Sequence, residues 1–576
     1  MKELLLGNAA VARGLYEAGC AVASSYPGTP STEITQNAAA YDEIYSEWAP
    51  NEKVAMEVAF GASLAGKRSF TGMKHVGLNV AADPLFTISY TGVNAGMVIA
   101  VADDPGMHSS QNEQDSRHYA IAAKVPMLEP ADSSECLEFT KYAYELSEKF
   151  DTPVLIRMCT RIGHSQSVVE MSERIEPAAV PYVKNAPKYV MMPGYARARH
   201  PIVEQRTLEL AKLAEDTFLN RVEMGGTDIG IVTSGTAYQY VKEVYGDSVS
   251  VLKLGMVNPL PEKLITDFAS KVKKLVVAEE LDCILERHCK TLGLTVTGKD
   301  IFPVVGELSQ NLVAEKMGLQ PPQGIALDIE IPQRPPVMCA GCSHRGLFYV
   351  LSKKKAIVHG DIGCYTLGAN APLSAMDTTI CMGASVSSLH GFNRAGGKNS
   401  VCVVGDSTFV HMGVNGLIDI AYNGSDSTVI ILDNSTTGMT GHQENPTTGY
   451  NIKGKPAGKI DLEALCRAMG ISRVRVVDPN DLEATEVAVS EEMDAPGPSV
   501  IIARRPCALL KTTKTHPPLK ADAQKCTGCR ACMKIGCPAL TIRENKADIN
   551  QTLCVGCGVC AQLCKFDAFA QTGKGA

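Results

Sequence analysis

Residues 403–438 read VVGDSTFVHMGVNGLIDIAYNGSDSTVIILDNSTTG. Two apolar runs, ending at Asp406 and at Asn434, flank a segment with the apolar spacing of a helix. A strand, a helix and a second strand in this order predict two parallel strands joined by a crossover helix. The carboxyl ends of parallel strands carry the loops that bind ligands. We therefore expect Asp406 and Asn434 to lie at the same edge of a sheet.

This pair of side chains suggests a metal–diphosphate site. Aspartate and asparagine oxygens suit Mg²⁺, which keeps coordination sites for a bound diphosphate, and a helix N-terminus receives further phosphate charge. The pair alone is weak evidence, because aspartate after glycine is common at strand ends. The pattern is also similar to the thiamine diphosphate signature, GDG followed by a later asparagine, although Ser407 stands where glycine is usual. That resemblance implies side-chain metal ligands at Asp406 and Asn434, a backbone ligand at Thr436, and cofactor contacts at Gly405, Ser407 and Gly438.

The same alternation of strand and helix extends over most of the 576 residues, which are too many for one hydrophobic core. RSFTGMKHV, GMVIAVADD and TPVLIRMCT read as buried strands, and EKVAMEVAFGASLAG reads as a helix. We expect a multidomain α/β fold with an α/β domain over 1–165, a smaller one over 226–330, a third over 331–515 and a cysteine-rich domain over 516–576. A connector over 166–225 begins with the irregular stretch PYVKNAPKYVMMPGYARARHP and continues as a long helix from Ile202 to Val222.

Composition excludes several classes of protein. A formal net charge of −7 gives no reason to propose nucleic acid as a partner. The N-terminus lacks the basic start and unbroken apolar stretch of a signal peptide. The longest apolar runs, such as VNAGMVIAVA, are about half as long as a membrane-spanning helix needs. We expect a cytoplasmic protein.

Twenty cysteines in such a chain predict metal sites rather than disulfides. Eight of them occur in CTGCRACMKIGC and CVGCGVCAQLC, near the C-terminus. Thiolates at C-x₂-C-x₂-C lie on one tight turn and hold three corners of a [4Fe–4S] cube, and the fourth ligand comes from the other run. Zinc is the alternative, but zinc sites favour paired C-x₂-C knuckles, whereas each run here has four cysteines.

The C-terminal region resembles the bacterial two-cluster ferredoxins. The resemblance implies a first tail set of ligands, Cys526, Cys529, Cys532 and Cys564, and a second tail set, Cys537, Cys554, Cys557 and Cys560. The chain departs from that family in two places: four residues rather than three precede Cys537, and Lys565 rather than proline follows Cys564. We expect the extra residue to bulge out beside Gly536 and ligation to survive. An altered potential or a labile cluster is the alternative.

Further motifs resemble the 2-oxoacid:ferredoxin oxidoreductases from end to end of the chain. They are YPGTPSTE (26–33), NEKVAMEVAFGASLAG (51–66), CAGCSH (339–344), DIGC (361–364) and the C-terminal cysteines. The resemblance implies two parallel-sheet domains for thiamine diphosphate, with the pyrimidine bound by 1–165 and the diphosphate and Mg²⁺ by 331–515. It also implies a transketolase C-terminal-like domain over 226–330 and a ferredoxin-like α+β domain over 516–576.

The resemblance also implies roles for individual residues. Glu52 matches the glutamate that activates the cofactor. Glu57 is the competing candidate for this role, and the alternative for Glu57 is a position on an exposed helix face. Thr29 matches a threonine near substrate and cofactor, although its hydroxyl is alternatively a turn stabiliser. Apart from the resemblance, the loop after the predicted strand GMVIAVADD offers Arg117 as a candidate for a substrate carboxylate, which arginine binds bidentately, unless it is merely a solvated loop charge. Weaker candidates for the site are Lys74, His75, His108, Gln114, Asp115, His344 and His442.

Many members of that family carry another cluster near the thiamine. The resemblance implies a third set of ligands, Cys339, Cys342, Cys364 and Cys507. Cys507 follows the predicted strand SVIIARR, which favours convergence of the set at one sheet edge. Buried structural cysteines are the alternative, and a common one. We interpret the remaining eight cysteines, such as Cys20 and Cys466, as core residues.

The implied reaction is oxidative decarboxylation of an arylpyruvate, chiefly indolepyruvate and also phenylpyruvate, to CO₂ and an acyl-CoA. Coenzyme A takes the acyl group, and external ferredoxin takes the electrons through the clusters. A smaller β subunit in an α₂β₂ complex is implied as well. One alternative is another 2-oxoacid as substrate. The others are a non-oxidative decarboxylase, against which the cysteines argue, and a non-catalytic electron-transfer subunit, against which Glu52, Asp406 and Asn434 argue.

Overall fold

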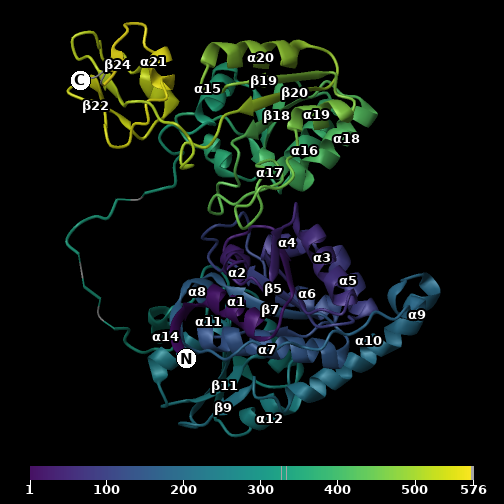
Figure 1. Ribbon diagram of the computed structural model, residues 1–576. Coiled ribbons are helices and arrows are strands. Elements are labelled where there is room, and N and C mark those ends of the chain that lie inside the picture. Colours follow the sequence, from purple (N-terminus) through teal and green to yellow (C-terminus); the bar gives the residue numbers. More distant parts are fainter. Residues whose placement is uncertain (323, 326, 333, 573–576) are drawn as a thin grey trace. The chain divides into compact units, whose positions relative to one another are not determined.

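The computed structural model describes residues 1–322, 324–325, 327–332 and 334–572. The chain forms two compact units, Met1–Asp328 and Ile329–Ala576. Both contain largely parallel sheets connected by helices, which confirms the predicted α/β class (Figure 1). Among the described helices, none has the length and apolar character needed to cross a membrane.

The first unit is built on a seven-stranded sheet in the order β12-β6-β7-β5-β4-β2-β3. All neighbouring strands are parallel except β12 and β6. The three central strands are buried along their whole length, as expected for a parallel sheet covered on both faces. The strands are β2 (Val22–Ser25), β3 (Tyr45–Trp48), β4 (Ser69–Lys74), β5 (Met97–Asp103), β6 (Met127–Leu128), β7 (Val154–Cys159) and β12 (Met256–Asn258).

Helices connect these strands and supply the core. In α7 (Ser133–Phe150), Asp132 accepts a hydrogen bond from the Glu135 N–H at the N-terminus, and the helix ends at left-handed Asp151. β1 (Lys2–Leu6) and β8 (Gln166–Glu170) form a separate two-stranded antiparallel sheet. The other helices before residue 165 are α1 (Gly7–Glu17), α2 (Thr32–Ala38), α3 (Glu52–Leu64), α4 (His75–Val80), α5 (Ala82–Thr91), α6 (Arg117–Ala123) and α8 (Thr160–His164).

The helix after residue 166 differs from the prediction at both ends. α10 (Pro193–Ala214) begins inside the stretch expected to be irregular, and the predicted end at Val222 is wrong because Arg221–Glu223 form strand β9. Pro193 suits a first helical turn, which needs no N–H donor. Tertiary contacts then stabilise the early start. The buried Arg199 donates to the Tyr90 carbonyl, at 2.6 Å, near the end of α5. A short helix, α9 (Ala186–Tyr189), precedes it.

A second sheet in the first unit has the order β14-β13-β10-β11-β9, with only the β9–β11 pair antiparallel. Its three central strands contain the apolar stretches GIVTS, SVLKL and KLVVA. Because β12 pairs with β6, the sequence after residue 226 also adds a strand to the first sheet. The elements are β10 (Ile229–Ser234), α11 (Gly235–Tyr245), β11 (Ser250–Leu254), α12 (Glu262–Ala269), β13 (Lys274–Ala278), α13 (Ile284–Thr291), β14 (Val296–Thr297) and α14 (Gln310–Lys316).

A buried ionic network around Arg117 joins the two sheets. Its Nη1 donates to Glu279 at 2.7 Å, and its Nη2 donates to Asp115 at 2.6 Å and to the carbonyls of Glu280 and Asp282. Although burial opposes its charge, Asp115 and Glu279 raise the pKa of Arg117. Arg117 is 1% exposed, and its guanidinium nitrogens donate their hydrogen bonds to groups of the protein. This geometry does not support the interpretation of Arg117 as the ligand of a substrate carboxylate.

Replacing Arg117 with methionine leaves Asp115 and Glu279 buried without their shared cation. Breaking a buried ion pair from one side costs about 3–5 kcal/mol, so R117M should lower the free energy of unfolding by about that amount in chemical denaturation. The half-exposed Arg161, which pairs with Glu307, is the control. R161M should change stability by about 1 kcal/mol or less. Equal stability of R117M and wild type would contradict the structural role.

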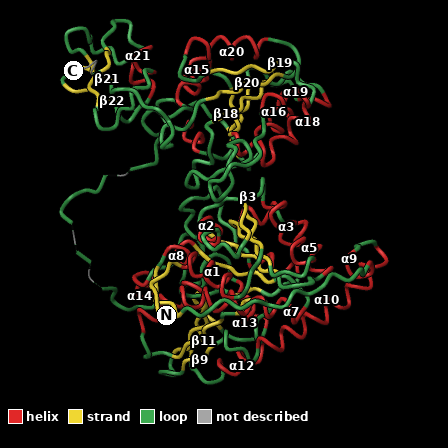
Figure 2. Tube along the Cα trace, in the orientation of Figure 1, coloured by secondary structure: helices red, strands yellow, loops and turns green. Residues whose placement is uncertain are grey.

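The second unit is built on a parallel six-stranded sheet in the order β16-β15-β17-β18-β20-β19 (Figure 2). β17 and β18 are neighbours, with Gly405 opposite Leu432, which confirms the prediction from residues 403–438. The strands are β15 (Ile357–Gly360), β16 (Thr378–Thr379), β17 (Ser400–Gly405), β18 (Thr428–Asp433), β19 (Arg473–Val477) and β20 (Ser499–Arg504). The helices are α15 (Arg345–Lys354), α16 (Ala384–Arg394), α17 (Asp406–Thr408), α18 (Val414–Asn423), α19 (Leu462–Ala468) and α20 (Leu482–Asp494).

The C-terminal region is a small α+β fold. Two antiparallel pairs form, β21 (Leu519–Ala521) with β24 (Phe569–Gln571) and β22 (Leu540–Arg543) with β23 (Lys546–Ile549). A 3₁₀ turn (Ala531–Ile535) and α21 (Val559–Gln562) carry cysteines between them. Its core is a small cluster that includes Leu519, Leu540 and Ile549, and so small a fold usually depends on metals or disulfides for stability.

Candidate functional site

Four neighbouring strands of the six-stranded sheet present the candidate residues at one edge. Because β15, β17, β18 and β20 are parallel and adjacent, Asp361, Asp406, Asn434 and Cys507 all follow their carboxyl ends. The N–H of Cys507 donates to the Asn434 carbonyl at 2.9 Å, which ties the loops after β18 and β20 together. The metal–diphosphate candidates and the third set of cysteines therefore share a sheet edge.

Asp406 is a buried carboxylate held in a fixed orientation. Its Oδ1 accepts from the Ser407 N–H at 2.7 Å, and its Oδ2 accepts from the Ser435 N–H at 3.0 Å and the Thr447 hydroxyl at 3.4 Å. Burial, aided by the charge of Asp433, raises the pKa of Asp406 to about 7. Among the described residues, no lysine or arginine forms an ion pair with it. A buried carboxylate of this kind fits a metal cation as its charge partner.

Asn434 lies beside Asp406 and faces a neutral histidine. Its Oδ1 accepts from the Thr436 N–H at 3.3 Å, and its Nδ2 is 3.4 Å from Nε2 of His344. Burial lowers the pKa of His344 to about 4, so the ring is uncharged at neutral pH. An uncharged ring leaves the electrostatic environment of a cation undisturbed. The structure thus brings Asp406, Asn434, Thr436 and His344 together.

Small residues keep space open around this pair. A Cβ at Gly438 would lie 3.5 Å from Sγ of Cys364, and one at Gly405 would lie 2.9 Å from the Tyr365 ring. The Gly405 N–H donates to the Tyr365 hydroxyl at 2.9 Å. Ser407, which replaces the usual glycine, is buried and hydrogen-bonds Thr437 at 3.1 Å.

Sequence reasoning missed three residues that hold this edge in place. Tyr365 directly follows the DIGC motif, and Thr447 lies in a loop without a recognisable signal. Asp361 is the first residue of that motif. Its buried carboxylate accepts from the N–H groups of Gly383, at 2.9 Å, and Ser385, at 3.0 Å, at the start of α16. The signal available for Asp361 was an acidic residue at the start of the DIGC motif.

The cysteines of the third set lie near enough to affect one another's pKa. Burial raises the pKa of Cys342 to about 12, and its neighbours Cys339 and Cys364 add to the effect. Burial likewise raises the pKa of Cys364 to about 11, with contributions from Cys507 and Cys339. His442 lies beside this set, with Nε2 3.7 Å from Sγ of Cys507. The structure therefore brings together the four thiols that the resemblance grouped.

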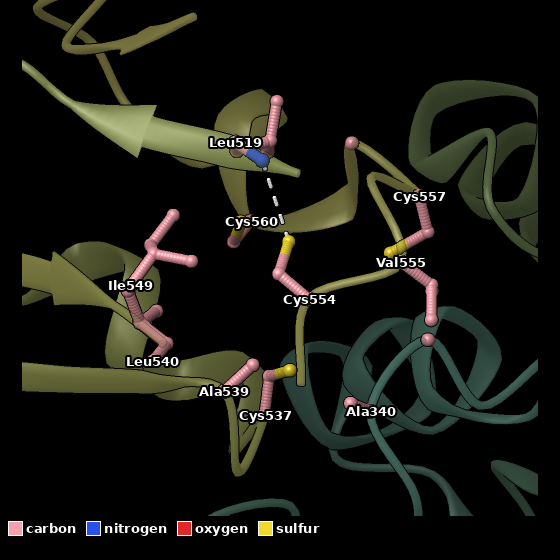
Figure 3. A pocket seen from close by; sticks show the side chains of 12 residues that line it. Ala340, Leu519, Cys537, Ala539, Leu540, Ile549, Cys554, Val555, Cys557 and Cys560 are labelled. Carbon is pink, nitrogen blue, oxygen red and sulfur yellow. Dashed lines mark hydrogen bonds between the residues drawn. The ribbon is translucent and has the colours of Figure 1, made fainter. Parts of the chain in front are cut away.

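The two tail sets each surround a separate hollow. The second tail set lines one of about 320 Å³ together with Ala340 and Gly341, and Figure 3 shows its cysteines around the space. The first tail set lines another of about 340 Å³. Backbone N–H groups point at the sulfurs, from Leu519 to Cys554 at 3.4 Å and from Ala547 to Cys526 at 3.3 Å. Such hydrogen bonds favour thiolates, as cluster ligation requires.

In the ranges that the structure describes, no three histidine, cysteine or acidic side chains converge closely enough to hold one metal ion. A [4Fe–4S] cluster takes its thiolates at four separate corners. Of the eight remaining cysteines, six are buried, but Cys283 is half-buried and Cys381 is exposed, so the core interpretation is wrong for these two.

In the first unit, the structure separates Glu52 from Glu57. Glu52 is the first residue of α3 and is buried behind the Asn51 cap. A Cβ at Gly77 would lie 2.6 Å from its Oε1, so Glu52 packs across the first turn of α4. Glu57 is half exposed and pairs with Lys53. Only Glu52 has the burial expected of a carboxylate that contacts a cofactor ring.

The loop that carries Thr29 lies against the end of β4. Gly28 approaches Lys74 closely, since an added Cβ would lie 3.0 Å from the Cβ of Lys74. Burial lowers the pKa of Lys74 to about 8, and its amine donates to the carbonyl of Ser109. His75, the next residue, is fully buried. The loop of Thr29 thus contacts the end of β4, and α4, which begins at His75, contacts Glu52 through Gly77.

The remaining weak candidates lie elsewhere. His108 is half exposed and is 3.1 Å from Glu307, and Gln114 donates to Asn112 at the surface. Asp115 belongs to the Arg117 network, which lowers its pKa although burial opposes the charge. None of these three is placed beside Glu52 by a described hydrogen bond.

Three family models match the chain. Residues 13–213 match the thiamine diphosphate-binding domain of pyruvate flavodoxin/ferredoxin oxidoreductases, and residues 361–503 match the C-terminal TPP-binding domain of thiamine pyrophosphate enzymes. Residues 518–565 match the 4Fe–4S dicluster domain. The chain thus contains thiamine diphosphate-binding domains and a 4Fe–4S dicluster domain.

Curated relatives match over the whole length. The indolepyruvate oxidoreductase subunit IorA of Archaeoglobus fulgidus is 41% identical over 98% of this chain and 96% of the relative. That of Methanothermobacter thermautotrophicus is 40% identical over 100% and 98%. A solved 2-oxoglutarate:ferredoxin oxidoreductase from Magnetococcus marinus is 18% identical over 55% of this chain and 65% of that one, with a TM-score of 0.46, which is too distant to bear on function. The near-complete, 41% identical match places the chain in the family of the indolepyruvate oxidoreductase subunit IorA.

Proposed function

We propose that the chain is the catalytic subunit of an indolepyruvate:ferredoxin oxidoreductase, which oxidatively decarboxylates arylpyruvates to aryl-acyl-CoA and CO₂. The observation that carries this proposal is the sheet edge shared by Asp406, Asn434 and the third set of cysteines. A cofactor that releases electrons and a group that accepts them would meet there. The name of the relatives, at about 40% identity, supports indolepyruvate as the substrate.

Residues of this chain would hold the cofactor and its metal in defined ways. Asp406 and Asn434 would bind Mg²⁺ through their side chains and Thr436 through its carbonyl, and Gly405, Ser407 and Gly438 would leave room for the diphosphate. Thiamine diphosphate supplies a carbon nucleophile and an electron sink when bound. Glu52 would hydrogen-bond the aminopyrimidine ring and promote the tautomer needed for activation, and Thr29 would lie near substrate and cofactor. The burial of Asp406 and Glu52 supports these roles.

The three cysteine sets would hold three [4Fe–4S] clusters in series. Ala340 and Gly341, between the first two cysteines of the third set, line the hollow of the second tail set. Clusters held in this order would offer electrons a path from the third set to the second tail set and then to the first tail set. Cys529 of the first tail set is exposed, which suits transfer to external ferredoxin.

The reaction needs partners that the chain does not include. Coenzyme A accepts the acyl group, and ferredoxin accepts the electrons. A smaller β subunit would complete an α₂β₂ complex in the cytoplasm. The relatives are named as subunits, which supports a partner chain.

An anaerobic assay tests the proposed substrate. The chain is purified with its partner subunit, and reduction of viologen is measured with coenzyme A and indolepyruvate, phenylpyruvate, pyruvate or 2-oxoglutarate. The highest kcat/KM is expected with indolepyruvate. Preference for pyruvate or 2-oxoglutarate would contradict the aryl assignment, and aldehyde release without viologen reduction would identify a non-oxidative decarboxylase.

Substitution of Glu52 tests the activating carboxylate. E52Q replaces the ionisable carboxyl group with an amide. It should lower kcat in the viologen assay by roughly 10²–10⁴-fold, the usual contribution of general acid–base catalysis. E57Q, on the exposed face of the same helix, should leave kcat within about twofold of wild type. An equal loss of kcat in both variants would show that activity depends on the integrity of the helix and not on the Glu52 carboxylate.

Loss of the metal ligand tests the diphosphate site. D406A should weaken Mg²⁺-dependent binding of thiamine diphosphate, measured by calorimetry, by more than about 10-fold, because even indirect partners of a metal contribute that much. EDTA should have the same effect on wild type. Asp419, a half-exposed residue of α18, is the control, and D419A should bind like wild type. Unchanged binding by D406A would remove Asp406 from the site.

A further inference from the structure

Arg345 is a buried residue that connects two cysteine loops. It is the first residue of α15 and is 5% exposed. Its Nη2 donates to the carbonyls of Met338, at 2.6 Å, and Cys339, at 3.1 Å. Its Nη1 donates to the carbonyls of Ile535, at 2.9 Å, and Gly536, at 2.7 Å. One guanidinium thus holds the start of the third set and the segment that leads into Cys537 of the second tail set.

The charge of Arg345 has no acidic counterpart in the protein. Among the described residues, no carboxylate lies within ion-pair distance of it, in contrast to Arg117 with Asp115 and Glu279. Carbonyl oxygens accept hydrogen bonds from both terminal nitrogens of Arg345, whereas its buried Nε has no hydrogen-bond partner among the described residues. The positive charge is left uncompensated, which is costly in a buried position. A [4Fe–4S] cluster with four thiolates is negatively charged, and net charge helps to set its potential. Two such sites adjoin Arg345, and each would supply the missing negative charge.

The segment with the extra residue before Cys537 supplies one side of this clamp. The four-residue segment 533–536 ends at Gly536 with φ +65°, a left-handed conformation that glycine adopts without strain. The Gly536 backbone lies so close to Pro372 that an added Cβ would be 2.7 Å from the proline Cδ. Ile535 and Gly536 therefore face Arg345, whereas Lys534 of the same segment is exposed.

The same two cysteine sets also meet through a second backbone contact. A Cβ at Gly341 would lie 2.1 Å from Cγ2 of Val555, so residues 339–342 pack directly on the turn between Cys554 and Cys557. Arg345 on one side and Gly341 on the other fix the spacing of the third set and the second tail set.

We propose that Arg345 is a positioning residue of the electron path, which locks the third set against the second tail set and places a positive charge beside both clusters. The inference rests on the proposed function, because it requires clusters at these cysteines. A cation beside a cluster stabilises the reduced, more negative form and so raises the midpoint potential. The hydrogen bonds of Arg345 to both cysteine loops would also keep the distance between the two clusters constant, and electron transfer depends on that distance.

EPR-monitored redox titration of the anaerobically purified complex tests the proposal. R345Q should lower the midpoint potential of at least one cluster and weaken the magnetic interaction between neighbouring reduced clusters. Signals of the first tail set, identified with a C529S variant, should not change. R345K should recover most of the potential because the charge returns. R475Q, at an arginine of the same unit that pairs with Glu491, should titrate like wild type.

A titration of R345Q that coincides with wild type at equal iron content would overturn the proposal. Equal shifts in R345Q and R345K would also overturn it, because charge would then have no part. If R345Q does not fold, G536A decides, since its Cβ would press on Pro372 and Arg345 while the charge remains. The magnetic interaction should change in G536A, and a spectrum identical to wild type would overturn the clamp. Less iron in wild type than three clusters require would instead count against the proposed function.

Discussion

The parallel pairing of β15, β17, β18 and β20 is the constraint on which the candidate site of the second unit depends. Parallel strands end at the same side of a sheet, so the residues that follow them converge without any long loop having to bring them together. Asp406 and Asn434 follow adjacent strands, and Cys507 follows the next, where its N–H reaches the Asn434 carbonyl. The tail sets then extend from this edge through residues 339–342, which contact the second tail set.

Buried charges distinguish structural from functional residues in this chain. Arg117 is surrounded by Asp115, Glu279 and two carbonyls, so its charge is balanced within the protein. Asp406 and Arg345 are equally buried but have no described ionic partner. A buried charge without a counterion is costly, and it persists where a ligand supplies the opposite charge. A bound cation would therefore balance the charge of Asp406, and two anionic clusters would balance the charge of Arg345.

Much of this arrangement could be predicted from the sequence because it depends on local pattern. Apolar runs gave the central strands, and the cysteine spacing gave two separate ligand sets, each of which lines its own hollow. What the sequence did not reveal depends on tertiary contacts. The start of α10 depends on carbonyls of α5, and the engagement of Arg117 depends on Glu279, more than a hundred residues later. The contact of Ile535 and Gly536 with Arg345 joins residues almost two hundred positions apart.

We propose that one chain holds both the thiamine site and three clusters in series that lead away from it. Iron and acid-labile sulfide, measured per chain on anaerobically purified protein, distinguish three clusters from two. We expect about twelve irons per chain, and about eight in a variant in which Cys339 and Cys364 are both serine. About eight irons in wild type, with no change on substituting those two cysteines, would contradict it. The third set would then hold no cluster, and the path would lack its first step.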